Sequence, residues 1–197
     1  MREMIVIGRI LNVINLLSLK MRNMKFTKTG NISDKSVFYK TASVTVLNPD
    51  KNALNIGAYT HIRGRVFVYH HGMIRIGSYC YVGENTNIWS AGQIVIGNRV
   101  LIAHNVNIVD NTSHPIDACK RHEHYRAIIS GGFPDINLDA KPIMIKDDAW
   151  INENAVIMRG ITVGMGAVVG AGSVVTQDVP DFAFAAGNPA RIIKKLK

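Results

Sequence analysis

The stretch from Ile145 to Pro180 reads IKDDAWINENAVIMRGITVGMGAVVGAGSVVTQDVP, and it decides the fold. Branched aliphatic residues recur in it at intervals of six: Ile145, Ile151, Ile157, Val163, Val169 and Val175. An α-helix repeats every 3.6 residues and an alternating strand every two, so neither produces this spacing. A period of six fits a short strand followed by a corner, and three such units close one coil of a triangular prism.

The same period runs through the upstream half of the chain, with two extra residues between successive sets of three. The upstream aliphatic residues are Ile56, Ile62, Val68, Ile76, Val82, Ile88, Ile96, Ile102 and Ile108. The residue four positions after each is small or β-branched, as at Thr60, Cys80 and Ala149, and the next residue after the aliphatic is often Gly. We expect the aliphatic residue and the residue four positions after it to face a narrow interior. The Gly residues are expected to supply compact corner turns.

The composition also favours strands. The 197 residues include 25 Ile and 19 Val but only 9 Leu, and β-branched side chains lose rotamer freedom in helices. A hydrophobic fraction of 47% excludes a disordered chain, and the length suits one domain with its own core. Two cysteines, Cys80 and Cys119, exclude a disulfide framework and a four-cysteine zinc site.

The net charge of +9 indicates an anionic partner. The sequence shows no zinc-finger spacing, no basic recognition helix and no aromatic RNA-binding signature. A phosphate-bearing small molecule therefore explains the charge better than nucleic acid does. A β-helical scaffold or anion-binding module stays open as the non-enzyme alternative.

Residues 1–29 are predicted to form a short amphipathic helical segment. An apolar stretch at 5–19 has basic flanks, but Arg9, Asn12 and Asn15 interrupt it and no small-residue cleavage site follows. The segment is expected to pack on the protein or on another subunit, with peripheral membrane contact as the alternative. The all-β repeat region is expected at 30–182, with a long loop inserted at 112–142, and a basic tail at 183–197.

The hexads, the Thr176-Gln-Asp-Val-Pro180 run and the Ala186-Gly-Asn-Pro-Ala-Arg191 segment together resemble the hexapeptide-repeat acyltransferases. The branch of maltose/galactoside and surface-polysaccharide O-acetyltransferases is the most similar, and the resemblance covers about residues 30–197. It implies a left-handed parallel β-helix of triangular cross-section, a cytoplasmic homotrimer and acetyl-CoA sites in clefts between neighbouring subunits. The inner face of the membrane is an alternative location.

Acetyl transfer to a hydroxyl needs a general base, and histidine suits this role near neutral pH. His114 follows the last regular coil before the insertion, in the run Asn111-Thr-Ser-His114-Pro. The resemblance places the catalytic histidine at this position. Asp110 and Asp117 are both candidates to orient its ring, and the sequence does not choose between them. No metal is expected.

The resemblance also places the acetyl-CoA contacts, at positions matching Trp150, Glu153, Ala171, Thr176, Gln177, Arg191 and Lys194. Cationic side chains at the C-terminus suit the phosphates of CoA. Two positions depart from the family pattern: Gln177 stands where Lys is common, and Glu153 stands where a small residue is common.

The acceptor is less sharply defined. Gly83 and Ala91 occupy the positions of the family's galactoside-binding Asn and Asp, so the sequence lacks that sugar clamp. Asn85 and Trp89 are the alternative sugar contacts. We therefore expect an O-acetyltransferase acting on a sugar or glycan precursor of a surface polysaccharide. N-acetylation of an amino sugar is the alternative reaction.

Overall fold

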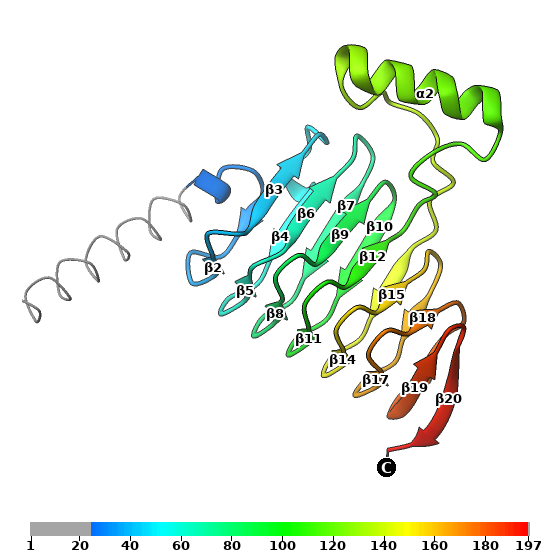
Figure 1. Cartoon of the computed structure of the whole chain (residues 1–197). Helices are drawn as coiled ribbons and strands as arrows, with labels where there is room; N and C mark the ends of the chain where they lie inside the picture. The colour runs from blue at the N-terminus through cyan, green and yellow to red at the C-terminus, as the bar shows by residue number, and fades with distance from the viewer. Residues whose placement is uncertain (1–24, 197) are drawn as a thin grey trace, which may run out of the picture.

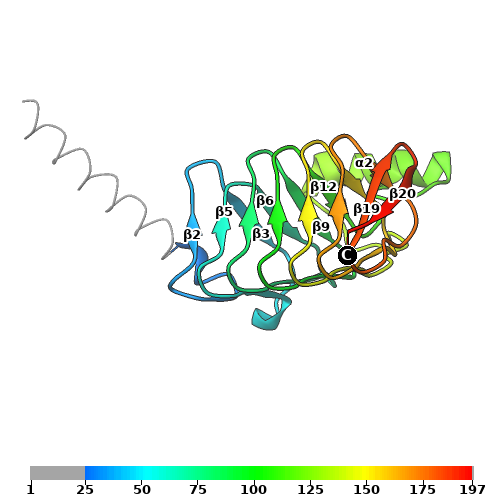
Figure 2. The same ribbon diagram turned by 90° about the horizontal axis from the view of Figure 1, so that it is seen from below.

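The computed structural model describes residues 25–196, which wind into successive coils along one axis (Figures 1 and 2). Each coil adds one short strand to each of three sheets, and strands of neighbouring coils pair in parallel. This is the predicted left-handed parallel β-helix of triangular cross-section. The predicted N-terminal amphipathic helix falls almost wholly on residues 1–24, outside the described part of the chain.

The three sheets, which we call A, B and C, follow one another around each coil. Sheet A contains β1 (Asn31–Ile32), β4 (Leu54–Ile56), β7 (Met73–Ile76), β10 (Gln93–Ile96), β13 (Ile143–Ile145) and β16 (Thr162–Val163). Sheet B contains β2 (Val37–Phe38), β5 (His61–Ile62), β8 (Tyr81–Val82), β11 (Leu101–Ile102), β14 (Trp150–Ile151), β17 (Val168–Val169), β19 (Ala183–Gly187) and β20 (Ala190–Lys195). Sheet C contains β3 (Ser43–Val46), β6 (Arg65–Val68), β9 (Asn87–Ser90), β12 (Asn107–Val109), β15 (Val156–Ile157) and β18 (Val174–Val175).

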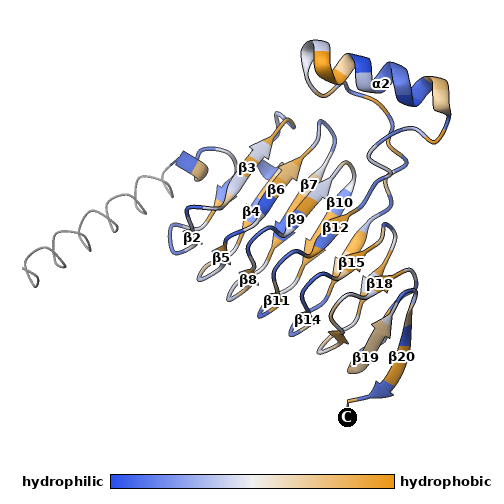
Figure 3. Cartoon of the chain, viewed as in Figure 1, coloured by the Kyte–Doolittle hydropathy of each residue, from blue (hydrophilic) through white to orange (hydrophobic). Residues whose placement is uncertain are grey.

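The interior of the prism is a ladder of branched aliphatic side chains. Ile102 pairs with Val82 of the preceding coil and with Ile151 of the next, and all three are fully buried. The small or β-branched residue four positions later is buried at most of these positions, as at Thr60, Cys80 and Ala149. Both predicted inward positions are therefore confirmed. Figure 3 shows the hydrophobic colours gathered in the strands of the coils.

The glycines that follow the aliphatic residues lie at corners, as predicted, but the predicted reason is wrong. The left-handed backbone falls two residues later, on Tyr59, Tyr79 and Asn85 among others. Gly77 is required instead by the closeness of the next coil. A Cβ atom there would lie 2.4 Å from the carbonyl oxygen of Gly97. The glycine column thus marks where two coils touch through their backbones.

The remaining segments attach to the coil stack at its corners and its end. The two-residue insertions form the turns that follow β6 and β9, and a 3₁₀ turn, η1 (Lys51–Ala53), precedes β4. The predicted basic tail contains an antiparallel hairpin, β19–β20, that continues sheet B. The insertion at 112–142 contains a helix that the sequence did not predict, α2 (Ala118–Gly131), which stands outside the coils (Figure 1).

Substituting Gly83 by Ala tests the backbone contact between coils. The new Cβ would lie 2.4 Å from the carbonyl oxygen of Ala103, so Gly83→Ala is expected to lower the free energy of unfolding by about 1–3 kcal/mol. Gly131→Ala, at the end of α2 where a Cβ meets no atom within 4 Å, should leave stability unchanged or slightly raised. Urea denaturation of both variants is the measurement. Equal effects would contradict the close-contact explanation.

Candidate active site

The insertion leaves and re-enters the β-helix through a narrow neck beside β9 and β12. The Asp110 carboxylate is fully buried and accepts hydrogen bonds from Ser90 Oγ at 2.6 Å, Ala91 N at 2.8 Å and Gly92 N at 3.0 Å. The amide of Lys141 donates to the carbonyl of Asp110 at 2.7 Å. The outgoing and returning chains are therefore joined to each other and to the neighbouring coil.

His114 stands just beyond this neck and is half-buried. Its amide donates to the carbonyl of Thr112 at 2.6 Å, after a left-handed residue at Ser113. The amide and hydroxyl of Thr112 in turn donate to the carbonyl of Leu138, at 3.0 and 2.9 Å. A short, doubly held loop thus presents the imidazole at the edge between sheets C and A.

The imidazole of His114 meets another histidine, which sequence reasoning missed. Its Nδ1 lies 3.0 Å from Nδ1 of His124 on α2, and the two rings are tilted by 67°. Neither sequence candidate fills this role: Asp110 holds the neck, and Asp117 caps the N-terminus of α2 by accepting from the amide of Lys120. His124 reaches His114 because of where it lies along α2, and no sequence motif around either residue indicates this contact.

His124 is 6% exposed, and burial lowers its pKa, with a smaller contribution from the neighbouring His114. Its imidazole is therefore neutral over more of the physiological pH range than that of a solvated histidine. A neutral ring can accept a hydrogen bond at one nitrogen, which an imidazolium cannot do.

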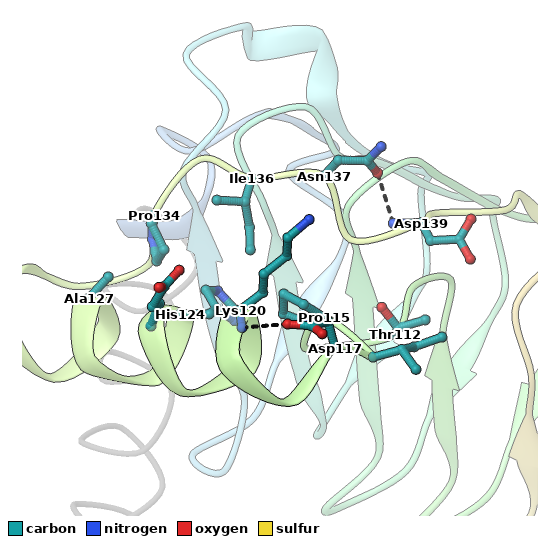
Figure 4. Close-up of a pocket in the computed structure, with 12 residues that line it drawn as sticks. Thr112, Pro115, Asp117, Lys120, His124, Ala127, Pro134, Ile136, Asn137 and Asp139 are labelled. Carbon is teal, nitrogen blue, oxygen red and sulfur yellow. Dashed lines mark hydrogen bonds between the residues drawn. The ribbon is translucent and has the colours of Figure 1, made fainter.

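A cavity of about 700 Å³ lies between α2 and the returning segment 134–139 (Figure 4). Its lining combines apolar residues with hydrogen-bonding ones: Thr112, Pro115, Ile116, Asp117, Lys120, Glu123, His124, Ala127, Pro134, Ile136, Asn137 and Asp139. The side chain of Lys120 extends from α2 toward Ile136 and Asn137. Apolar surface interleaved with carboxylate, amide and ammonium groups suits a ligand with several hydroxyls.

The returning segment is fastened to the corner turn after β6. His70 Nε2 lies 2.9 Å from the carbonyl of Phe133, and His71 Nε2 lies 3.0 Å from Asp135. The Phe133 ring packs against Phe67, whose ring lies 6.0 Å from that of Trp89. Trp89, a predicted sugar contact, thus belongs to an aromatic cluster on the outer face of sheet C.

The other predicted site residues fall into separate groups. Asn85, Glu153 and Ala171 are exposed at the corner column between sheets B and C, and the amide of Gly172 bonds the carbonyl of Glu153. Thr176 and Gln177 follow β18 at the C–A edge, the same edge that carries the insertion. Trp150, 47% exposed, lies on the outer face of sheet B, and Arg191 and Lys194 are exposed on β20.

The prism places two of these groups on opposite sides. The chain passes from sheet A to B to C and back to A, so the C–A edge is the edge opposite sheet B. His114 lies at that edge, whereas Trp150 faces outward from sheet B. Within one chain, the predicted base His114 and the predicted acetyl-CoA contact Trp150 therefore lie on opposite sides of the coil.

Residues 25–196 hold no cluster of three or more His, Cys, Asp or Glu side chains arranged to bind a metal ion. Among the helices described there, none has the length and apolar character required to cross a membrane.

Comparison with known proteins identifies the family. The family described as "Bacterial transferase hexapeptide (six repeats)" matches residues 142–177. A hexapeptide-repeat containing acetyltransferase from Vibrio cholerae O1 biovar eltor, solved with acetyl coenzyme A, is 33% identical. The match covers 72% of this chain and 70% of that chain, with a TM-score of 0.57. The chain belongs to the hexapeptide-repeat acetyltransferases.

Two more proteins are similar to this hexapeptide-repeat acetyltransferase. A 2,3,4,5-tetrahydropyridine-2,6-dicarboxylate N-acetyltransferase from Staphylococcus aureus is 50% identical over 56 residues, 28% of this chain and 23% of that protein. The aligned part thus spans less than a quarter of that relative. A mutant of AntD, an N-acyltransferase from Bacillus cereus solved with dTDP and coenzyme A, is 18% identical over 88% of this chain and 89% of that chain, with a TM-score of 0.65. At this identity the similarity shows the shared fold.

Proposed function

We propose that the protein transfers an acetyl group from acetyl-CoA to a hydroxyl of a sugar, in a precursor or component of a surface polysaccharide. One observation carries the proposal: the neck holds His114 half-buried with its Nδ1 3.0 Å from Nδ1 of His124, and His124 lines a cavity of about 700 Å³. The relative from Vibrio cholerae, solved with acetyl coenzyme A, supports the choice of donor. The mixed lining of the cavity supports the choice of a hydroxyl-bearing acceptor.

In the proposed reaction His114 acts as the general base. Its Nε2 removes the proton from the acceptor hydroxyl while that oxygen forms a bond to the thioester carbonyl carbon. The C–S bond then breaks, and the imidazolium of His114 returns the proton to the departing sulfur. A positioned base contributes about 10²–10⁴-fold to the rate of such a step.

The donor site proposed here uses Trp150, Glu153, Ala171, Thr176, Gln177, Arg191 and Lys194. Each of these residues is exposed, which supports the proposal because a ligand can reach it. Arg191 and Lys194 would hold the phosphates, because a guanidinium and an ammonium form charge-assisted hydrogen bonds with phosphate oxygens. Asn85 and Trp89 remain the proposed acceptor contacts.

The active enzyme in this proposal is a homotrimer whose sites lie between subunits. His114 and Trp150 lie on opposite sides of one chain, at the C–A edge and on the sheet B face. A neighbouring subunit that presents its sheet B toward this edge would bring the two groups together. Closed cyclic assemblies repeat such a contact identically at every interface.

Replacing the base is the first test. We expect His114→Ala to lower turnover at least about 100-fold, because the hydroxyl proton loses its acceptor, while the affinity for acetyl-CoA stays nearly the same. The assay follows acetyl-CoA consumption with a panel of nucleotide sugars, and calorimetry measures CoA binding. His122→Ala, an exposed position on α2, is the matched control. Retained turnover in His114→Ala would remove His114 from the mechanism.

The shared site is tested by mixing two impaired chains. His114→Ala and Trp150→Ala subunits, co-expressed with different tags and purified as mixed trimers, should regain activity. In each mixed trimer, one of the three interfaces receives an intact His114 from one chain and an intact Trp150 from its neighbour, so about one third of the wild-type activity is expected. Mixed trimers as inactive as the parent variants would place both residues in the site of a single chain.

N-acetylation is the second candidate, because the Staphylococcus aureus relative is an N-acetyltransferase. The same base can remove a proton from an amine as it attacks, so His114 does not separate the two reactions. Treatment of the product with hydroxylamine does: the proposed ester is cleaved, whereas an amide survives. A product that resists hydroxylamine would replace the proposed O-acetylation by N-acetylation.

A further inference from the structure

Helix α2 is attached to the rest of the protein in an unusual way. Of its fourteen residues, all within the described part of the chain, only His124 is buried. The middle of the helix is coloured hydrophilic in Figure 3, and the helix presents no apolar face to the coils. Most protein helices are stabilised by packing an apolar stripe. Here the one buried side chain is an imidazole that meets the proposed base.

We infer that His124 is a positioning residue, which holds the neutral imidazole of His114 in the Nδ1–H tautomer and thereby leaves its Nε2 free to act as the base. The geometry that carries this inference is the 3.0 Å contact between the two Nδ1 atoms, made by a buried side chain. The inference rests on the proposed function, since it assigns a role within that reaction.

The tautomer follows from counting protons. A neutral imidazole carries one N–H, so a base that accepts a proton at Nε2 must carry its hydrogen on Nδ1. The Nδ1–H of His114 then donates to Nδ1 of His124, which must be unprotonated and hold its own hydrogen on Nε2. The two rings therefore occupy opposite tautomers, and each fixes the other. Without the lone pair of His124 Nδ1, His114 could carry its hydrogen on Nε2. It would then present an N–H instead of a lone pair to the hydroxyl of the sugar substrate.

The surroundings of His124 favour the neutral ring that this arrangement requires. Burial lowers its pKa, and a positive charge on His114 lowers it further. The charged groups that line the adjoining cavity are Asp117, Lys120, Glu123 and Asp139. Asp117 already accepts from the amide of Lys120, and Asp139 pairs with Arg159. Within residues 25–196, His124 makes its side-chain hydrogen-bond contact with His114 and none with a carboxylate that would stabilise its imidazolium form.

The same hydrogen bond becomes stronger during the reaction. When Nε2 of His114 takes the substrate proton, the ring becomes an imidazolium and its Nδ1–H becomes a charge-assisted donor. The lone pair of His124 then faces that donor. His124 thus stabilises the charged state of His114 more strongly than its neutral state. A contact that strengthens only as the reaction proceeds raises turnover and leaves ground-state binding unchanged.

Two variants of one shape test the inference. Asn and Leu share the same branched arrangement of four side-chain heavy atoms, but Asn places an acceptor oxygen close to the position of Nδ1, whereas Leu places a methyl group there. We expect His124→Leu to lower kcat about 10–100-fold, the usual effect of losing an orienting partner, with the KM for acetyl-CoA unchanged. His124→Asn should recover most of this loss. His122→Leu makes the same change at an exposed position of α2 and should have no effect.

The tautomer itself gives a readout that does not depend on activity. In protein labelled with ¹⁵N-histidine, the imidazole shifts of His114 should show Nδ1–H in the wild type and lose this state in His124→Leu, with unfolding temperatures compared to check folding. Wild-type His114 with its proton on Nε2 would overturn the inference, as would equal kcat losses in the Asn and Leu variants or no loss in either. Failure of the proposed function is separate: it appears as retained turnover in His114→Ala.

Discussion

Backbone hydrogen bonds between successive coils are the interaction on which the rest of the structure depends. Ala103 N donates to the carbonyl of Ile151 at 2.9 Å, and Gly83 N donates to the carbonyl of Ile102 at 2.9 Å. These bonds set a strand spacing of about 4.8 Å, so each residue of a paired strand lies directly above its counterpart in the neighbouring coil. Aliphatic side chains then stack inside, and at Gly77 and Gly97 the backbones touch without room for a Cβ. Each hexad position thus carries its own steric rule.

This arrangement explains how the β-helix accepts a long insertion without losing its register. The chain departs after Asp110 and returns at Lys141, where the amide of Lys141 bonds the carbonyl of Asp110. Sheet A resumes at once, because Ile143 pairs with Ile94 in the interior ladder. The insertion therefore interrupts a corner and no strand. It also explains the neck: a buried carboxylate that accepts from three neighbouring groups prevents the exit point from shifting.

The sequence predicts those parts of the molecule in which residues stack from coil to coil with a period of six. A period of six places Ile102 and Thr86 inside, and the structure buries both. The spacing locates the glycine column but not its cause, because a sequence shows where a side chain is absent and does not show that the backbone of the next coil lies opposite. Helix α2 escaped prediction since its stability does not come from an apolar stripe. His124 could not be paired with His114 from sequence, because the contact depends on how a folded insertion returns over its own neck.

The proposed site divides between two structural systems that are built by different rules. Every residue that lines the large cavity comes from the insertion, between Thr112 and Asp139. The proposed acetyl-CoA contacts come from the coils and the terminal hairpin, between Trp150 and Lys194. The coils are fixed by stacking, so they can keep the donor and the proposed acceptor contacts Asn85 and Trp89 in place. The insertion, which is fastened to the stack at its neck and at the turn after β6, supplies the cavity. His114 belongs to the insertion but lies at the neck, next to the coils. In the proposed reaction it is therefore the residue where the insertion meets the donor held by the coils.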